Sequence, residues 1–538
     1  MTTHSLAKSS TVMALGTIFS RITGLARGLL TVAVLGTALL GDTFNVANTM
    51  PNILYNLIIG GALTAVFVPQ IVRATRDSDG GNAFISRLVT ATTTLLFVIT
   101  VISVIGAPLL VRVFATEYVG RPEFHLAVAF MRYCLPQILF MGIFAMLSQV
   151  ANAKHRFGAM MWAPILNNII AIAIFSWFLK NAHNLSVGSI THSEVIWIGA
   201  GTTAGYLVQA LVLVPVIRRT GIRITPRFDW RDKEIAKSTR LALWTLAFAA
   251  ISQISYLVTV NISTRAAVHA AKAGITTGVG FTPYSNAILI MMLPHSIITI
   301  SVMTALLPHL SGFVIDKRPD LIHDQLVKAM RLVGIITVPS AVAFFLFGPI
   351  ITRVLFFGIP DGDAQYIGKV LAALGLGLMP MSVNLIALRG LNAFENVKLQ
   401  VLSNFLMNIV GAGLSVVAAL ALAPRWVTVG LGGALSVSYF IGAWSTIRLL
   451  RRYEINIRIR EVTGFYLKLF GLAFVVGFPL HISQHHLPGG NIGKLAIVLT
   501  ITGAFYLALT YLFKVEEVRS MITLVTQRFI RKGEIEKR

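Results

Sequence analysis

Long runs of apolar residues, separated by short polar segments, fill the chain from end to end. Fourteen of these runs are long enough to cross about 30 Å of hydrocarbon as helices. The pattern therefore predicts an all-α polytopic membrane protein with fourteen transmembrane helices. The predicted spans are 12–40, 43–72, 86–115, 124–151, 157–180, 194–217, 238–268, 279–311, 326–355, 364–392, 397–423, 427–450, 461–482 and 492–513.

Composition agrees with this interpretation. Of the 538 residues, 55% are hydrophobic and only 12% are charged, whereas a soluble domain carries about 25% charged residues. The net charge of +24 does not indicate nucleic-acid binding, because the basic residues gather in alternate loops such as 73–87, 218–240 and 448–460. The intervening loops 180–193 and 483–491 are nearly free of Lys and Arg. The positive-inside rule then predicts that both termini are cytoplasmic.

The chain also resembles itself at an offset of 240 residues, where Asn152-Ala153 recurs as Asn392-Ala393 and Asn168-Ile169 as Asn408-Ile409. Chance similarity among apolar helices is the alternative. Two repeats with an even number of spans each would be parallel and pseudo-symmetric. We expect three parts: an N-lobe of six spans at 1–220, a C-lobe of six spans at 221–455, and 456–538 with two C-terminal helices and a cytoplasmic amphipathic tail.

The first span contains the most informative side chains. Arg21 and Arg27 are its only charges, and an arginine near the bilayer centre costs about 2.5–3.5 kcal/mol. Ser20, Thr23 and Arg27 share one helix face. Guanidinium groups bind phosphate bidentately, and hydroxyls add hydrogen bonds. We therefore predict a water-filled cationic cavity that binds an anion; for Arg21, snorkelling to the head groups is the alternative.

The second span opens with a carboxylate and contains a proline. Asp42 is either an N-cap or a carboxylate that pairs with a cavity arginine, and both roles are compatible. Pro51-Asn52 predicts an interrupted ladder lined by free backbone groups and an amide. The same interruption is expected at Pro136, Pro164, Pro294 and Pro380.

Further charges lie within or near the spans, and Arg265 is the candidate for a cavity cation of the second half. The others are Arg132, Lys369, Arg389 and Lys468. Enzyme motifs are absent, since Gly493-Lys494 lacks the glycines and the Ser/Thr of a nucleotide-binding loop. The single cysteine, Cys134, excludes an internal disulfide and a cysteine metal cluster. We expect a transporter without a metal or another cofactor.

The residues quoted so far resemble the opening of the MviN/MurJ family, within the multidrug/oligosaccharidyl-lipid/polysaccharide exporter superfamily. The resemblance covers nearly the whole chain, and its most specific part is the SR-x-x-G-x-x-R opening. The motifs are Ser20-Arg21-Ile22-Thr23-Gly24-Leu25-Ala26-Arg27, Gly41-Asp42-Thr43-Phe44, Pro51-Asn52, Gly61-Ala62, Phe67-Val68-Pro69, Leu293-Pro294 and Leu307-Pro308-His309-Leu310-Ser311.

This resemblance implies that Arg21, Arg27, Asp42, Ser20 and Asn52 occupy central-cavity positions that matter in the family. It also implies the cargo, lipid II, which is an undecaprenyl-diphosphate-linked disaccharide peptide.

Two family arginines do not carry over. Their positions hold Tyr55-Asn56 and Leu289 here, so the cavity charge is lower or supplied elsewhere, with Arg265 the candidate. Some relatives use acidic residues for a sodium site, but Asn392 and Asn396 stand near the corresponding positions. Sodium coupling is therefore not expected.

The sequence thus predicts a flippase of the bacterial plasma membrane. It would move lipid II from the inner to the outer leaflet by alternating access, as a monomer whose partners are lipid II and membrane lipids. Three alternatives stay open. They are a flippase for another polyprenyl-diphosphate glycan, a drug or cation antiporter, which would need cavity carboxylates, and a non-transporting scaffold with basic docking loops.

Overall fold

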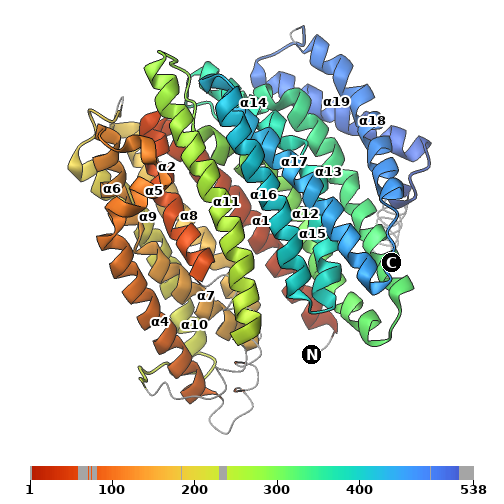
Figure 1. The fold of residues 1–538 in the computed structure, drawn as a ribbon, viewed down its shortest axis with the longest axis horizontal. Helices are drawn as coiled ribbons and strands as arrows, with labels where there is room; N and C mark the ends of the chain where they lie inside the picture. Colours follow the sequence, from red (N-terminus) through yellow and green to blue (C-terminus); the bar gives the residue numbers. More distant parts are fainter. Residues whose placement is uncertain are drawn as a thin grey trace, which may run out of the picture. The chain divides into compact units, whose positions relative to one another are not determined.

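Every regular element that the structure describes is helical. The computed structural model describes residues 3–58, 71, 74, 81–154, 156–182, 185–228, 239–484 and 486–519. Within these ranges the chain forms α-helices and two short 3-10 helices, without a strand (Figure 1). An α-helix pairs its backbone groups within one segment, which hydrocarbon requires because it offers no hydrogen-bond partner. The all-α fold predicted from the sequence is confirmed.

The helices follow the predicted order. In the first half they are α1 (Thr3–Leu35), α2 (Leu39–Ile58), α4 (Asn82–Ile105), α5 (Ala107–Phe114), η2 (Thr116–Tyr118), α6 (Pro122–Cys134), α7 (Gln137–Ala153), α8 (Phe157–Asn181), α9 (His192–Leu211) and α10 (Leu213–Arg218). In the second half they are α11 (Thr239–Lys272), α12 (Phe281–Ile315), α13 (Pro319–Leu355), α14 (Asp361–Gly375), α15 (Leu378–Ala393), α16 (Val397–Ala421), α17 (Pro424–Leu450), η4 (Arg451–Tyr453), α18 (Ile459–Ser483) and α19 (Asn491–Leu512).

The number of spans is consistent with the prediction. Among the described residues, eleven helices are long and apolar enough to cross a membrane. The count rises to twelve if α14 and α15, which are bent by 45°, form one span. Helices α2 and α12 occupy the two remaining predicted spans. The predicted second span and the amphipathic tail both run into segments outside the described residues, 59–70 and 520–538.

The prolines divide into two groups. Helix α7 begins just after Pro136, and α15 begins with Pro380 in its first turn, so both follow an interruption of the helix. By contrast, Pro51, Pro164 and Pro294 lie inside helices that continue through them. At these three positions the interruption is confined to the ladder bond that each proline removes, because a proline does not have to end the helix.

The chain divides into two compact units. The first comprises Met1–Asn286, Phe356–Asp363 and Gly411–Leu431, and the second comprises Ala287–Leu355, Ala364–Val410 and Gly432–Arg538. The predicted boundaries at 220 and 455 follow the internal repeat in the sequence, whereas these two units are defined by how compactly the chain packs. The two six-helix lobes stay a prediction.

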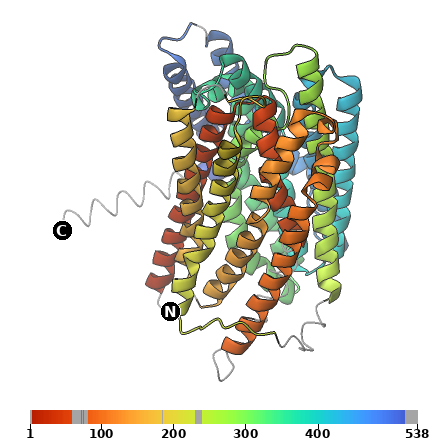
Figure 2. The same ribbon diagram turned by 90° about the vertical axis from the view of Figure 1, so that its left-hand side faces the viewer.

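In the first unit, α1 packs along α8, and α8 packs along α9 (Figure 2). Gly16 allows the first of these contacts, because a Cβ atom added there would lie only 2.9 Å from the indole nitrogen of Trp162. Helix α2 lies against α6, and α11 lies against α2 and η2.

In the second unit, a buried polar network joins α15, α16 and α17. The Ser403 hydroxyl lies 2.7 Å from the Ser445 hydroxyl and 2.6 Å from the Thr446 hydroxyl. Thr446 in turn lies 2.7 Å from the Asn384 amide oxygen, to which its hydroxyl donates. The Asn384 amide nitrogen reaches the Met407 sulfur at 3.7 Å. These bonds hold three helices together without charges.

We predict that Thr446→Val destabilises the protein more than Thr352→Val. The first change removes hydrogen bonds between helices, whereas the hydroxyl of Thr352 bonds only to carbonyls of its own helix. Interhelical bonds of this kind contribute about 1 kcal/mol in membranes, and the difference in the free energy of unfolding should be of that size. Thermal or denaturant unfolding in detergent measures it. Equal stabilities of the two variants would show that the network contributes nothing.

Candidate functional site

The polar face of α1 is held by α8. The amide nitrogen of Asn168 donates to the Thr23 hydroxyl at 3.0 Å and lies 3.2 Å from the Ser20 carbonyl oxygen. The Thr23 hydroxyl donates to the Phe19 carbonyl oxygen at 2.9 Å. Thr23 therefore fastens α1 to α8, and its hydroxyl is already engaged. Ser20 and Thr23 lie on one face of α1, as predicted. Their partner on α8 is Asn168, which the sequence had shown only as part of the internal repeat.

Arg27 lies one turn further along the same helix and is half-buried. Its guanidinium carbon is 6.0 Å from the centre of the Tyr206 ring on α9, at the limit of a cation–π contact. Neither Arg27 nor the more exposed Arg21 forms an ion pair within the described ranges. A guanidinium has five N–H donors, and no carboxylate that the structure describes engages those of Arg27 or Arg21. Arg27 thus keeps its charge available inside an apolar span.

Asp42 does not cap its own helix, which was one of the two roles considered for it from the sequence, and its pairing with a cavity arginine stays a prediction. It lies in the first turn of α2 and is fully buried, and its two carboxylate oxygens accept the backbone N–H groups of Phe281 at 2.8 Å and Thr282 at 2.6 Å. These are the first N–H groups of α12, which have no partner within their own helix. Asp42 therefore caps α12 rather than its own helix, and its oxygens are engaged in this conformation. Gly280 leaves room for it, because an added Cβ would collide with the carboxylate.

A second carboxylate lies beside this contact. Asp363, at the start of α14, accepts the Thr37 hydroxyl at 2.6 Å and the Gly278 backbone N–H at 3.0 Å. Sequence reasoning did not select Asp363, although the acidic pair Asp361 and Asp363 just before an apolar span was a signal for a helix N-terminus. We call this arrangement the two-aspartate contact: Asp42 and Asp363 together join the α1–α2 turn, the loop before α12 and the start of α14.

The other predicted site residues have partners of their own. The Asn52 amide oxygen accepts the amide N–H of Asn56 at 3.1 Å, and Asn52 is exposed on α2. The Arg265 side chain is 53% exposed, and its Nε lies 3.6 Å from the Glu117 carboxylate in η2. The imidazole of His269 lies 3.8 Å from the same carboxylate. Arg265 is therefore in an ion pair near one end of α11, and its role as a cavity cation stays a prediction.

A better unpaired cation lies in the second unit. Arg389 on α15 is half-buried, and its Nε is buried without a hydrogen-bond partner among the described residues. It is seven residues from Ser382 and so shares a helix face with it. The Ser382 hydroxyl lies 3.4 Å from Nδ1 of His295 on α12. The sequence had shown Arg389 inside an apolar span but had ranked it behind Arg265.

The described part of the chain holds no cluster of three or more His, Cys, Asp or Glu side chains that could bind a metal ion.

Comparisons with known proteins agree with the resemblance seen in the sequence. Residues 31–499 match the family described as lipid II flippase MurJ. The chain is 25% identical over 522 residues to the probable lipid II flippase MurJ of Thermotoga maritima, covering 96% of this chain and 99% of that protein. It is 29% identical over 429 residues to the corresponding protein of Rhizobium tropici, covering 78% and 77%. For the one from Haemophilus influenzae the identity is 23% over 479 residues, covering 86% and 89%.

Solved structures show the same fold. A lipid II flippase MurJ in an inward closed conformation superposes with a TM-score of 0.75 at 19% identity, covering 95% of this chain and all of that one. An inward-facing multidrug resistance MATE family transporter superposes with a TM-score of 0.64 at 15% identity, covering 82% and 98%.

The two-aspartate contact predicts how the loop before α12 responds to mutation. The reporter of loop movement is a cysteine introduced into this loop as Val279→Cys. It replaces a side chain that is only 3% exposed, and the native Cys134 is buried as well, so slow labelling of both thiols is expected while the contact is intact. Adding Asp42→Asn removes charge-assisted hydrogen bonds, each of which contributes about 1.5–3 kcal/mol. We expect the rate of labelling by a water-soluble maleimide to rise about tenfold or more.

The matched control is Asp320→Asn, which removes an exposed carboxylate paired with Arg318 outside this contact. It should leave the labelling rate of the introduced thiol unchanged. A slow rate in the Asp42→Asn protein as well would mean that the cap does not hold the loop.

Proposed function

Because this chain belongs to the lipid II flippase MurJ family, we propose that it carries lipid II from the inner to the outer leaflet of a bacterial plasma membrane. The step is transport and not catalysis, since no covalent bond of the cargo changes. The head group would cross through the protein while the undecaprenyl tail stays in the lipid. The cargo is then recognised through the charge that its diphosphate carries.

The observation that carries this proposal is the unpaired guanidinium of Arg27. Placing it in an apolar helix costs about 2.5–3.5 kcal/mol, and no described carboxylate offsets that cost. A diphosphate would offset it, because arginine binds phosphate oxygens with two parallel hydrogen bonds. Arg21, six residues before it on α1, would add a second charge to the path of the head group.

The two-aspartate contact supports alternating access. It joins the α1–α2 turn of the predicted N-lobe to two segments of the predicted C-lobe, the loop before α12 and the start of α14. With cytoplasmic termini, as the basic loops favour, these segments lie at the outer face. We propose that the contact is closed while the cargo enters from the cytoplasm and that it opens to release the head group outside.

An energy source is available without nucleotide hydrolysis. The cargo is anionic, and an inside-negative membrane potential moves each negative charge outward with about 2.3 kcal/mol per 100 mV. A cationic protein group that travels with the cargo would cancel part of this contribution. Arginines that stay in place while the lobes rock around them would not.

The antiporter alternative is less well supported, although MATE transporters share the fold. A cation carrier needs a free carboxylate in its cavity. In the first unit, Asp42 and Asp363 each accept two hydrogen bonds, and Glu117 faces Arg265. A flippase for another polyprenyl-diphosphate glycan would use the same phosphate chemistry, so the cargo itself has to be compared.

The test is transport of lipid II in reconstituted vesicles, timed by an added enzyme that cleaves only outward-facing head groups. We expect Arg27→Ala to lower the rate about tenfold or more, since charge-assisted hydrogen bonds contribute about 1.5–3 kcal/mol. Arg27→Lys should restore part of it, because charge returns without the bidentate geometry. Arg318→Ala, which removes an exposed arginine paired with Asp320, is the matched control and should transport normally.

Two results would contradict the proposal. One is an unchanged rate in a folded Arg27→Ala protein. The other is faster transport of a polyprenyl-diphosphate glycan that lacks the peptide, which would assign the protein to that cargo.

A further inference from the structure

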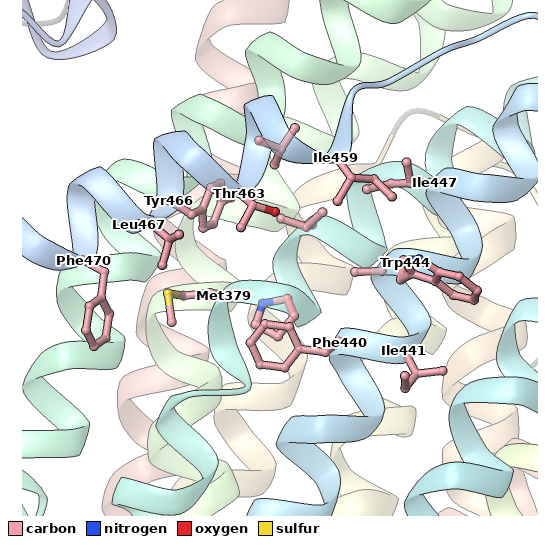
Figure 3. Close-up of a pocket in the computed structure, with 14 residues that line it drawn as sticks. Met379, Phe440, Ile441, Trp444, Ile447, Ile459, Thr463, Tyr466, Leu467 and Phe470 are labelled. Carbon is pink, nitrogen blue, oxygen red and sulfur yellow. The ribbon is translucent and has the colours of Figure 1, made fainter.

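A large apolar groove lies in the second unit, apart from the residues discussed so far. Its volume is about 600 Å³, and it is formed by side chains of α15, α17 and α18 (Figure 3). Met379 and Phe440 lie on one side of it, and Leu467 and Phe470 lie on α18. Phe440 is 52% exposed and Leu467 is 64% exposed, so the groove is open to the surroundings at these two side chains. This volume is typical of a site that accepts a small molecule.

The lining offers almost no hydrogen bond to an occupant. Only two lining side chains have a hydroxyl group, Thr463 and Tyr466. The hydroxyl of Tyr466 is already engaged, because it donates to the Met330 carbonyl oxygen at 2.8 Å. An occupant of this groove is therefore a hydrocarbon chain. All three helices belong to predicted membrane spans, so the surrounding lipid supplies such chains at high concentration.

One end of the groove has a basic rim. Trp444 lines the groove, and the Arg448 guanidinium carbon lies 5.0 Å above its ring. Ile459 also lines the groove, and Arg458 and Arg460 are its two neighbours in the chain. Two further exposed arginines, Arg451 and Arg452, form most of the 3-10 helix between α17 and α18.

These five arginines, which we call the arginine rim, form no ion pair with any residue that the structure describes. An apolar groove ending in several unpaired guanidinium groups matches a lipid with an anionic head group and a hydrocarbon chain.

We infer that this groove binds an anionic phospholipid of the cytoplasmic leaflet, with one acyl chain along α18 and its phosphate at Arg448, Arg458 and Arg460. The lipid would fill the space between α18 and the pair α15 and α17, and so attach the C-terminal helices to the rest of their unit. The arginines are exposed at a predicted membrane surface and do not line a path across the membrane. That placement favours a resident lipid over the transported cargo. The inference needs only the membrane location and not the proposed transport.

The test uses quenching of tryptophan fluorescence by lipids with brominated chains. The signal of Trp444 is the difference between the native protein and a Trp444→Phe variant in the same vesicles. The probes are brominated phosphatidylglycerol and brominated phosphatidylcholine, each present as a minor component of unbrominated phosphatidylcholine. We expect the anionic probe to quench Trp444 at a concentration at least about fivefold lower, since one arginine near an anionic surface changes affinity by about that factor.

The variant that tests the rim is Arg448→Gln combined with Arg458→Gln and Arg460→Gln. This triple variant should lose the preference for brominated phosphatidylglycerol, and its quenching by brominated phosphatidylcholine should stay unchanged. The matched control is Arg425→Gln, which alters an arginine beside Trp426 at the other end of α17. It should keep the preference.

Two outcomes would overturn the inference. Equal quenching by both probes in the native protein would mean that the groove contacts bulk lipid without selecting a head group. Relief of the quenching by added lipid II, but not by unbrominated phosphatidylglycerol, would make the groove a site for the cargo.

Discussion

A single constraint governs this molecule: hydrocarbon offers no partner to a polar group, so each one inside a span must find its partner within the protein. The described chain meets it by forming helices throughout and by joining α15, α16 and α17 through Ser403, Thr446 and Asn384. Asp42 meets it by accepting the first two N–H groups of α12. Arg27 is an exception among the predicted site residues, since no described carboxylate pairs with it.

The proposed cargo rests on a contrast between acids and bases among the described residues. In the first unit, Asp42, Asp363 and Glu117 are engaged by backbone N–H groups, by a hydroxyl or by arginine, whereas Arg27 and Arg21 pair with no carboxylate that the structure describes. In the second unit, the buried Nε of Arg389 also has no partner among the described residues. Such a distribution suits an anionic cargo and disfavours a cationic one. The family to which the chain belongs and this charge distribution are two separate supports for the proposed function.

Much of the fold could be predicted from the sequence, because the length of an apolar run determines where a helix can span the membrane. The common face of Ser20, Thr23 and Arg27 also follows from helical periodicity. What could not be predicted was each polar partner. Asp42 meets residues 239 and 240 positions away, and Arg265 meets Glu117 in η2. Such pairings depend on how helices pack, which periodicity does not encode, and for the same reason the sequence did not single out Asp363.

The central claim is that Arg27 binds the diphosphate of the cargo, and chemical protection tests it most directly. The protein in detergent would be treated with phenylglyoxal, which modifies arginine, with and without lipid II, and each arginine would be followed by peptide mass spectrometry. The account predicts that lipid II slows modification of Arg27 and leaves the loop residue Arg318 unaffected. Equal modification of Arg27 with and without lipid II, in a preparation that transports lipid II once it is reconstituted into vesicles, would contradict it.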